Sequence, residues 1–340
     1  MPESLMKQDS EYTLRCYEEN LRFIAEDYFR AELIDREQFP IEDVGKRPII
    51  LVCNHSGMGL SWDNIVLDFL IYDLLLKALG DPRLAIENKV VRLVDPLFMS
   101  HGTVQPFLLK NWWRRTGCVA ATSDNFQTAM QDNRIVLVSP EGVAGIAKGP
   151  HRKYELQPFS TSFLRMAHRH GAWVVPVSII NAEYLNPWNI SLSWLNALGR
   201  KLGFPFVPIG TGMLQAVLPA TYLNPRPAKL TYVLQEKMGF ALGPEHAHAV
   251  LKEECEVFRY QQQEKLRMAL SRYHAPYGVG EWLSRLRSSR RRKMFFPIFW
   301  HEMFLKTAGA PAWLSVLYKI PLGYPLIWIA NRLLPTVPRG

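Results

Sequence analysis

Short apolar runs recur through the middle of the chain and alternate with longer segments in which apolar residues are spaced three and four apart. The runs are rich in Val, Ile and Leu and are followed by turn-forming residues, which is typical of strands buried on both faces. The longer segments have the spacing of amphipathic helices. The alternation predicts an α/β fold with a mainly parallel sheet covered by helices. The predicted strands are 48–53, 84–86, 117–121, 135–139, 172–180 and 229–235.

Helical segments are predicted before, between and after these strands. The first is amphipathic, with Leu14, Leu21 and Ile24 spaced to share one face. Pro82 breaks the chain after the second helix, because proline cannot continue the hydrogen-bond pattern, and Gly171 ends a later one. The predicted helices are 11–36, 62–79, 90–99, 105–115, 124–132, 159–170 and 244–271.

Length and composition indicate a globular protein with a sizeable core. With 340 residues, of which 48% are hydrophobic and 21% charged, the chain is neither disordered nor a polytopic membrane protein. We expect three parts: an N-terminal amphipathic helical region over 1–45, an α/β domain over 46–240 and a helical, basic and aromatic C-terminal region over 241–340. The start of the chain shows no basic segment followed by an apolar core, so no secretory signal is expected.

The cysteines and histidines show no pattern of a disulfide framework or a metal site. Cys53 and Cys118 fall in apolar strand patterns and are predicted to be buried thiols, which fits a reducing compartment. The His-x-His pairs at 168–170 and 246–248 lack a third clustered ligand, so no metal is predicted. The chain has four cysteines in all, Cys16, Cys53, Cys118 and Cys255.

Positive charge is concentrated at the C-terminal end. Residues 281–340 hold ten Lys or Arg against Glu281 and Glu302, which is +8 of the total net charge of +9. A polybasic cluster followed by aromatic residues favours a segment lying on an anionic membrane over a solvated tail. Nucleic acid is not a predicted partner, because no nucleic-acid-binding motif accompanies the cluster. The cluster comprises Arg285, Arg287, Arg290, Arg291, Arg292 and Lys293, followed by Phe295, Phe296, Phe299 and Trp300.

Two weakly charged stretches bear on how the protein meets lipid. Residues 202–225 carry no charge, and 307–331 carry Lys319 near the middle, but both contain several prolines. A continuous membrane-spanning helix is therefore not expected in either. They are predicted to be membrane-dipping or acyl-binding surface, with a buried core loop as the alternative. The expected location is the cytoplasmic face of a membrane, as a peripheral or monotopic protein.

Candidate chemistry follows two of the predicted strands. The first strand runs into Asn54-His55 and a glycine-rich turn that ends at Asp63, and the fourth runs into Ser139-Pro140-Glu141-Gly142. Histidine is the side chain best suited to general-base work near neutral pH, and a nearby carboxylate can fix its tautomer. Polar groups after parallel strands gather at one edge of a sheet, which is where α/β proteins place their sites.

Together these segments resemble the glycerolipid acyltransferase superfamily, which includes the lysophosphatidate and glycerol-3-phosphate acyltransferases. The resemblance covers roughly residues 20 to 235 and implies an α/β fold and transfer of an acyl group from acyl-CoA or an acyl carrier protein, with no other cofactor. It also implies that His55 is the general base, that Asp63 orients it and that Glu141 helps to hold the acceptor. Four blocks carry it in order: Asn54-His55 with Asp63, Gly117-Cys118-Val119-Ala120, Ser139-Pro140-Glu141-Gly142 and Val175-Pro176-Val177.

The chain departs from the family pattern at the first block and at two basic positions. Seven residues, 56–62, separate His55 from Asp63, where the family usually has four. Ser123 ends the second block where family members that use glycerol-3-phosphate or lysophosphatidate carry Arg, and Val143-Ala144-Gly145 follows the third where another basic residue is common. A phosphate monoester needs Arg or Lys in reach. We therefore expect an acceptor without a phosphate monoester.

Downstream cations could substitute if the acceptor were anionic, since long side chains on a loop can swing in. Lys148, Arg152 and Lys153 are the candidates. The predicted substrate-binding residues are Ser123, Ser139, Glu141, Gly142, Lys148 and Arg152.

The sequence favours an O-acyltransferase that acts on a lipid or amphipathic alcohol at a membrane surface. The alternative is a non-catalytic lipid-binding or membrane-tethering protein that keeps the fold, a reading favoured by the wide spacing of His55 and Asp63. A serine lipase is disfavoured, because the chain has no Gly-x-Ser-x-Gly turn.

Overall fold

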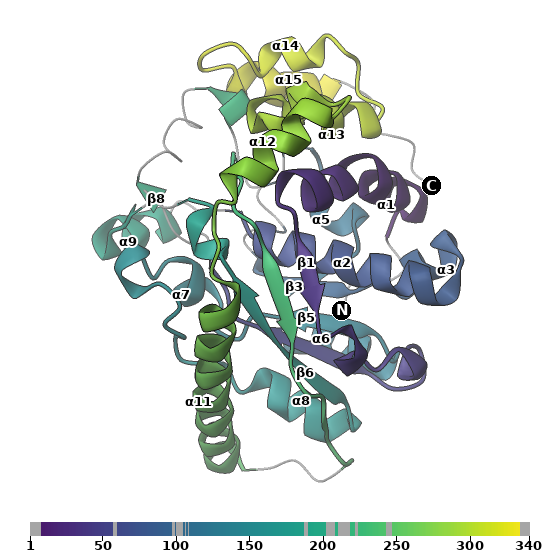
Figure 1. Cartoon of the computed structure of the whole chain (residues 1–340), viewed down its shortest axis with the longest axis vertical. Coiled ribbons are helices and arrows are strands. Elements are labelled where there is room, and N and C mark those ends of the chain that lie inside the picture. The colour runs from purple at the N-terminus through teal and green to yellow at the C-terminus, as the bar shows by residue number, and fades with distance from the viewer. Residues whose placement is uncertain are drawn as a thin grey trace.

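One twisted sheet runs through the centre of the protein, with helices on both faces (Figure 1). The computed structural model describes residues 8–56, 60–96, 99, 105, 107, 109–186, 190–201, 208–209, 218–221, 224–242 and 247–333. The strand order in the main sheet is β1-β9-β6-β2-β5-β3-β4, with β10 beside β6, and β7 pairs with β8 separately. The strands are β1 Glu32–Ile34, β2 Ile49–Cys53, β3 Val91–Val94, β4 Cys118–Ala120, β5 Ile135–Val138, β6 Trp173–Ile180, β7 Ile190–Ser191, β8 Pro208–Ile209, β9 Thr231–Leu234 and β10 Met238–Gly239.

Most pairs in the main sheet are parallel. β2 lies parallel to β5 and β6, β3 lies parallel to β4 and β5, and β1 lies parallel to β9. β9 and β10 pair with β6 in the antiparallel direction. The predicted α/β fold with a mainly parallel, helix-covered sheet is confirmed.

Two hydrophobic cores fill the spaces on either side of the sheet. The side chains of β2 alternate between them: Leu51 and Cys53 face one core, and Ile50 and Val52 face the other. The N-terminal helices, α2 (Trp62–Leu79) and α13 (Trp300–Thr307) contribute to the first core. Helices α6 (Ser123–Gln131), α8 (Ser162–His170) and α11 (His248–Tyr273) contribute to the second. Burial on both faces explains why the strands read as continuous apolar runs.

The helices match most of the predicted helical segments, with some differences in length. The α-helices are α1 Ser10–Cys16, α2 Trp62–Leu79, α3 Pro82–Glu87, α5 Trp112–Arg115, α6 Ser123–Gln131, α7 Val143–Ile146, α8 Ser162–His170, α9 Ser193–Lys201, α11 His248–Tyr273, α12 Val279–Ser288, α13 Trp300–Thr307, α14 Leu314–Leu317 and α15 Tyr324–Leu333. Two π-helical segments are η2 Tyr17–Leu21 and η3 Phe23–Tyr28. Short 3-10 turns are Arg36–Gln38, Ile41–Asp43, Pro150–Arg152, Ala182–Tyr184, Pro219–Thr221, Arg292–Phe295 and Pro297–Phe299.

Two adjacent predictions were wrong. Residues 84–86, predicted as a strand, lie in α3, because the Asp81 side chain caps the backbone N–H of Arg83 and Pro82 occupies the first turn. Residues 90–99, predicted as a helix, contain β3, which fills the gap between β5 and β4 in the sheet. For the predicted helix 105–115, only α5 near its end is described as helix.

The N-terminal helix ends earlier than predicted. The helical segment that begins at Ser10 stops at Tyr28, and Arg30 then takes a left-handed backbone conformation with φ of 50°. The chain leaves in the extended form of β1, whose residues pair with Thr231, Tyr232 and Val233 of β9. Tertiary pairing therefore overrides the helical periodicity after this point.

The aromatic residues of the C-terminal segment pack inward, which corrects part of the predicted membrane contact. Phe295 and Trp300 are fully buried, and the Trp300 ring lies against Tyr28 and Trp62 at centroid distances of 4.8 Å and 5.1 Å. The 3-10 turns before α13 bring this segment back onto the N-terminal helices. Phe296, by contrast, keeps 49% of its surface exposed.

Among the residues described, no helix has both the length and the apolar character needed to cross a membrane. Most of 202–225 lies outside the described residues, so the expectation for that stretch stays a prediction. All four cysteines are buried and unpaired, as predicted for Cys53 and Cys118.

Candidate active site

The end of β2 is fixed in place by Asn54, the residue before the candidate base. The Asn54 side-chain amide donates to the carbonyl of Ile179 at 3.1 Å and accepts from the N–H of the same residue at 2.7 Å. This two-point contact ties the chain leaving β2 to its neighbour β6. His55 therefore starts from a rigid backbone at the carboxyl edge of the sheet.

His55 and Asp63 lie in direct contact despite their separation in sequence. His55 Nδ1 is 2.8 Å from Asp63 Oδ2, and the Asp63 carboxylate is completely buried. The same carboxylate accepts hydrogen bonds from the backbone N–H groups of Ser56 and Asn64. The Tyr232 hydroxyl on β9 donates to the Asp63 carbonyl at 2.8 Å, which holds the start of α2 against the sheet.

This contact determines which nitrogen of the imidazole can act as a base. A carboxylate only accepts hydrogen bonds, so Nδ1 of His55 carries the proton toward Asp63. The lone pair of Nε2 then faces the opposite way, where Ser61 Oγ lies 3.3 Å from it. His55 is 5% exposed and lines a pocket, so its basic nitrogen is accessible from that side.

The Glu141 carboxylate holds the backbone of His55 in place. One Glu141 oxygen accepts from the backbone N–H of His55 at 2.9 Å, and the other accepts from the N–H of Gln157 at 2.7 Å. Burial raises the pKa of the Glu141 carboxyl, and the positive charge of Lys148 opposes that shift. Glu141 does not line the described pocket, so its contacts are those of a residue that positions His55.

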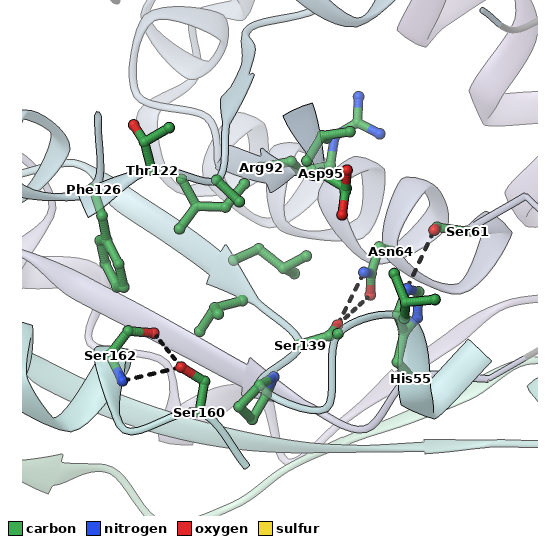
Figure 2. Close-up of a pocket in the computed structure, with 18 of the residues that line it drawn as sticks. His55, Ser61, Asn64, Arg92, Asp95, Thr122, Phe126, Ser139, Ser160 and Ser162 are labelled. Atoms are coloured by element: carbon green, nitrogen blue, oxygen red, sulfur yellow. Dashed lines mark hydrogen bonds between the residues drawn. The ribbon is translucent and has the colours of Figure 1, made fainter. Parts of the chain in front are cut away.

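A pocket of about 400 Å³ opens at the carboxyl ends of β3, β4 and β5 (Figure 2). His55, Ser61, Asn64 and Ser139 lie together at one end, and Thr122, Phe126, Ser160 and Ser162 lie at the other. Aliphatic side chains also line this pocket. They are Leu60, Leu93, Val94, Leu137, Val138, Val143 and Ile146.

The predicted binding residues divide into two groups. Ser123, Ser139 and Gly142 line the pocket. The N–H of Gly142 donates to the carbonyl of Ser139 at 2.9 Å, so this N–H group is used within the turn.

The two predicted cations lie away from the pocket lining and have acidic partners. Lys148 Nζ is buried 2.8 Å from the Glu183 carboxylate and also donates to the His55 carbonyl at 3.4 Å. Arg152 pairs with Glu155, three residues on, at 2.7 Å. Glu183, in the 3-10 turn after β6, thus compensates the charge of Lys148, and Glu155 compensates that of Arg152 within the loop after α7.

Sequence reasoning missed several residues that line the pocket. Arg165 lies on α8, and Arg92 lies on β3, where it stacks near Trp113 and its Nε is 2.9 Å from the buried Asp68 carboxylate. A charge inside the apolar run 90–94 was a usable signal for Arg92, because a buried strand rarely holds an unpaired cation. Arg165 gave no such signal, since one arginine on an amphipathic helix is ordinary. Ser61 and Asn64 flank Asp63 in the His55–Asp63 motif, so the sequence provided no separate reason to place them in the pocket.

Within the described part of the chain, no group of three or more His, Cys, Asp or Glu side chains is placed to hold a metal ion. What the site offers is an imidazole paired with a buried carboxylate, several hydroxyl and amide groups, and a number of aliphatic side chains on the pocket wall.

The fold and the site define an α/β protein with a His–Asp pair at the sheet edge above a largely apolar pocket. Residues 26–180, which are 155 of the 340 residues, match the family model described as Acyltransferase. This match agrees with the resemblance to acyltransferases that the four sequence blocks indicated. The matched segment holds both His55 and Glu141.

Curated relatives are similar over a little more than half of the chain. An uncharacterized protein of Mycobacterium tuberculosis strain H37Rv is 28% identical over 190 residues, 56% of this chain and 47% of the relative. An uncharacterized protein of Mycobacterium leprae is 27% identical over 210 residues, 62% of this chain and 51% of the relative. The chain thus spans about half the length of these relatives.

Among solved structures, the 1-acyl-sn-glycerophosphate (LPA) acyltransferase PlsC from Thermotoga maritima aligns with 76% of this chain and 79% of its own, at 16% identity and a TM-score of 0.41.

Proposed function

We propose that the protein transfers a fatty acyl group from a thioester, either acyl-CoA or an acyl carrier protein, to a hydroxyl of a lipid or amphipathic alcohol. The observation that carries this proposal is the 2.8 Å contact between His55 Nδ1 and the buried Asp63 carboxylate at the end of an apolar pocket. A hydroxyl is a poor nucleophile until a base takes its proton, and Nε2 of His55 faces the pocket where that hydroxyl would lie. The aliphatic wall suits the acyl chain.

The alternative of a non-catalytic lipid-binding protein loses its main support. That reading rested on the seven residues between His55 and Asp63, and the two side chains nevertheless meet at hydrogen-bond distance. A protein that only bound lipid would need neither a buried carboxylate behind the imidazole nor Glu141 beneath it. The experiment below separates the two functions directly.

The test is release of free thiol from acyl-CoA by the purified protein in the presence of mixed lipid acceptors. His55→Ala should lower turnover by roughly two to four orders of magnitude while the protein stays folded, because the base is lost. Asp63→Asn should be nearly as damaging, because the imidazole loses its orienting anion. Full turnover by His55→Ala would exclude this mechanism, and binding of lipid without any thiol release would favour the alternative.

The acceptor is proposed to lack a phosphate monoester, because Ser123 and Val143-Ala144-Gly145 stand at the usual basic positions. Diacylglycerol-like alcohols and lyso-phosphodiesters should be acylated in preference to lysophosphatidate in a purified assay. Arg165 makes this prediction testable by mutation, because the other arginine on the pocket lining, Arg92, is paired with the buried Asp68. If lysophosphatidate is acylated efficiently and Arg165→Ala raises its KM, the prediction is wrong and Arg165 is the phosphate ligand.

Attachment to a membrane surface is part of the same proposal. The cationic side chains around the end of α12 are exposed, and so are apolar side chains of the neighbouring C-terminal helices. Together, these basic and apolar groups would hold the protein on an anionic bilayer, from which a lipid acceptor could enter the pocket.

A further inference from the structure

Ser61 completes a chain of three groups that the reaction proposed above does not require. Its Oγ lies 3.3 Å from His55 Nε2, and His55 Nδ1 lies 2.8 Å from Asp63 Oδ2. A hydroxyl, an imidazole and a buried carboxylate in this order form the arrangement that activates a serine nucleophile. We propose that Ser61 accepts the acyl group first, so that transfer proceeds through an acyl-serine intermediate. This inference rests on the proposed acyl transfer and adds a step to it.

The Ser61 hydroxyl is used unusually for its position. Ser61 is the residue before α2, where a serine side chain ordinarily accepts a hydrogen bond from the first turn of the helix. Here the side chain makes no capping hydrogen bond, and its contact is with the imidazole of His55. Asp63 accepts from the N–H of Asn64 instead, which satisfies one donor of that turn. The hydroxyl is therefore directed to the base rather than to the helix.

Other hydroxyls on the pocket wall have different partners. Ser139 Oγ accepts from the Asn64 amide at 3.0 Å and lies 3.2 Å from the Cys53 thiol. Ser160 and Ser162 bond to each other at the opposite end of the pocket (Figure 2). Of the pocket hydroxyls that the structure describes, Ser61 is the one in contact with the His55 ring. Geometry thus selects one nucleophile.

The two half-reactions balance. In the first, His55 Nε2 takes the proton of the Ser61 hydroxyl as Oγ attacks the thioester carbonyl carbon, and a C–O bond forms. The C–S bond then breaks, and the proton passes from His55 to the leaving thiolate. In the second, the acceptor hydroxyl gives its proton to His55 and attacks the acyl-serine carbonyl. The bond between that carbon and Ser61 Oγ breaks, and His55 returns a proton to the serine.

A donor for the oxyanion of both tetrahedral intermediates lies at the same end of the pocket. The Asn64 side-chain NH₂ group has two N–H bonds, and the hydrogen bond to Ser139 uses one of them. The second can stabilise a developing negative charge on the acyl oxygen.

Exchange of the thiol without any acceptor separates this route from direct transfer. An acyl-serine intermediate allows labelled free thiol to enter the acyl thioester pool when no acceptor is present, whereas direct transfer does not. The probe is the acyl thioester that supports transfer, incubated with its own isotope-labelled thiol. Wild-type protein should catalyse exchange, and Ser61→Ala should lose both exchange and transfer by at least about a hundredfold. Ser271→Ala, an exposed serine on α11, is the matched control and should exchange normally.

A second variant guards against a merely structural loss. Ser61→Cys keeps a nucleophile at the same place and should gain the mass of one acyl group, in a linkage that neutral hydroxylamine cleaves. Transfer without exchange in the wild type, or transfer retained by Ser61→Ala, would overturn the acyl-serine route and leave Ser61 as a group that occupies the acceptor's place. If the wild type shows neither transfer nor exchange with any thioester, it is the proposed acyl transfer itself that fails.

Discussion

Single residues around His55 are packed with little room to spare. Gly145 on α7 is close to both His55 and Glu141. A Cβ atom at this position would be 2.9 Å from the Cβ of Glu141 and 3.1 Å from the Cβ of His55. The backbone conformation of Gly145 is an ordinary one, so the reason for glycine is space and not φ. The position of the imidazole thus depends on a missing methyl group on a neighbouring helix.

Gly145→Ala is expected to lower turnover by roughly tenfold to a hundredfold, because displacing a catalytic group by about 1 Å can cost that much. The thermal midpoint should fall only modestly, since the added methyl is small. Turnover and thermal unfolding of the purified variant are the measurements. Gly280→Ala on α12, where a new Cβ meets nothing within 4 Å, is the control and should be active. Unchanged turnover by Gly145→Ala would show that the contact yields without moving His55.

The sequence motifs predicted the place of some residues in the site but not of others. Asn54, His55, Asp63 and Glu141 follow strands in a recognisable order, so their gathering at one edge could be foreseen. The pairing of His55 with Asp63 was implied by the family resemblance alone, because the contact across seven residues depends on how the intervening loop folds. Ser61 and Gly145 carry no signal of their own, since a serine before a helix and a glycine after Pro-Glu-Gly are both ordinary in sequence.

At the level of elements, the strands buried on both faces were read correctly and the errors fell where charge or tertiary pairing intervened. Arg92 interrupts the apolar run of β3, and its buried partner Asp68 is distant in sequence, so the run looked helical. The extended form of residues 32–34 exists because β9 supplies hydrogen bonds from about two hundred residues away. The local hydrophobic pattern gives no information about either partner, Asp68 or β9, because both are distant in sequence.

One element has a consequence for acid stability. His301 on α13 is buried and stacks on Tyr318 with ring centroids 4.9 Å apart. Burial lowers the pKa of the His301 imidazole from its ordinary 6.5 to about 4. Between these two values the unfolded chain binds a proton that the folded protein does not, so stability falls as the pH drops.

The free energy of unfolding of the wild type should therefore lose about 2 to 3 kcal/mol from this group between pH 7 and pH 4.5, in addition to other acid effects. His301→Phe keeps the aromatic stack and removes the proton, so the variant should lose that much less. Urea unfolding at the two pH values measures the difference, with His248→Phe at an exposed histidine as the control. Equal acid losses in wild type and His301→Phe would mean that the buried imidazole is protonated in the folded state.

For the whole molecule, the question is which surface meets lipid. The buried Phe295 and Trp300 cannot reach a bilayer while α13 is docked. Exposed apolar side chains of the same region can: Phe296, Trp313, Val316 and Leu322 keep 49%, 53%, 55% and 68% of their surfaces exposed. The combination of basic and apolar contact stays a prediction, in which Phe296 and residues outside the predicted aromatic cluster supply the apolar part.

Reversing three charges near α12 tests this surface. Arg290→Glu, Arg291→Glu and Arg292→Glu together should move the protein out of the pellet when it is sedimented with anionic vesicles, because each cation contributes about 1 kcal/mol. Turnover on detergent-solubilised substrate should be preserved. Lys252→Glu, Arg267→Glu and Arg272→Glu on α11 change the net charge equally and should leave sedimentation nearly unchanged. Equal pelleting of both triple variants would indicate that only net charge, or another surface, governs the attachment.

The contact between Trp300 and Trp62 limits how this protein can be divided. Trp62 directly precedes Asp63, and its ring rests on Trp300 from the C-terminal segment at 5.1 Å. A chimera that took its tail from one relative and its α/β domain from another would have to bring both rings from compatible parents. The C-terminal segment and the start of α2, which holds the carboxylate, are therefore expected to have changed together during divergence, as one unit of inheritance.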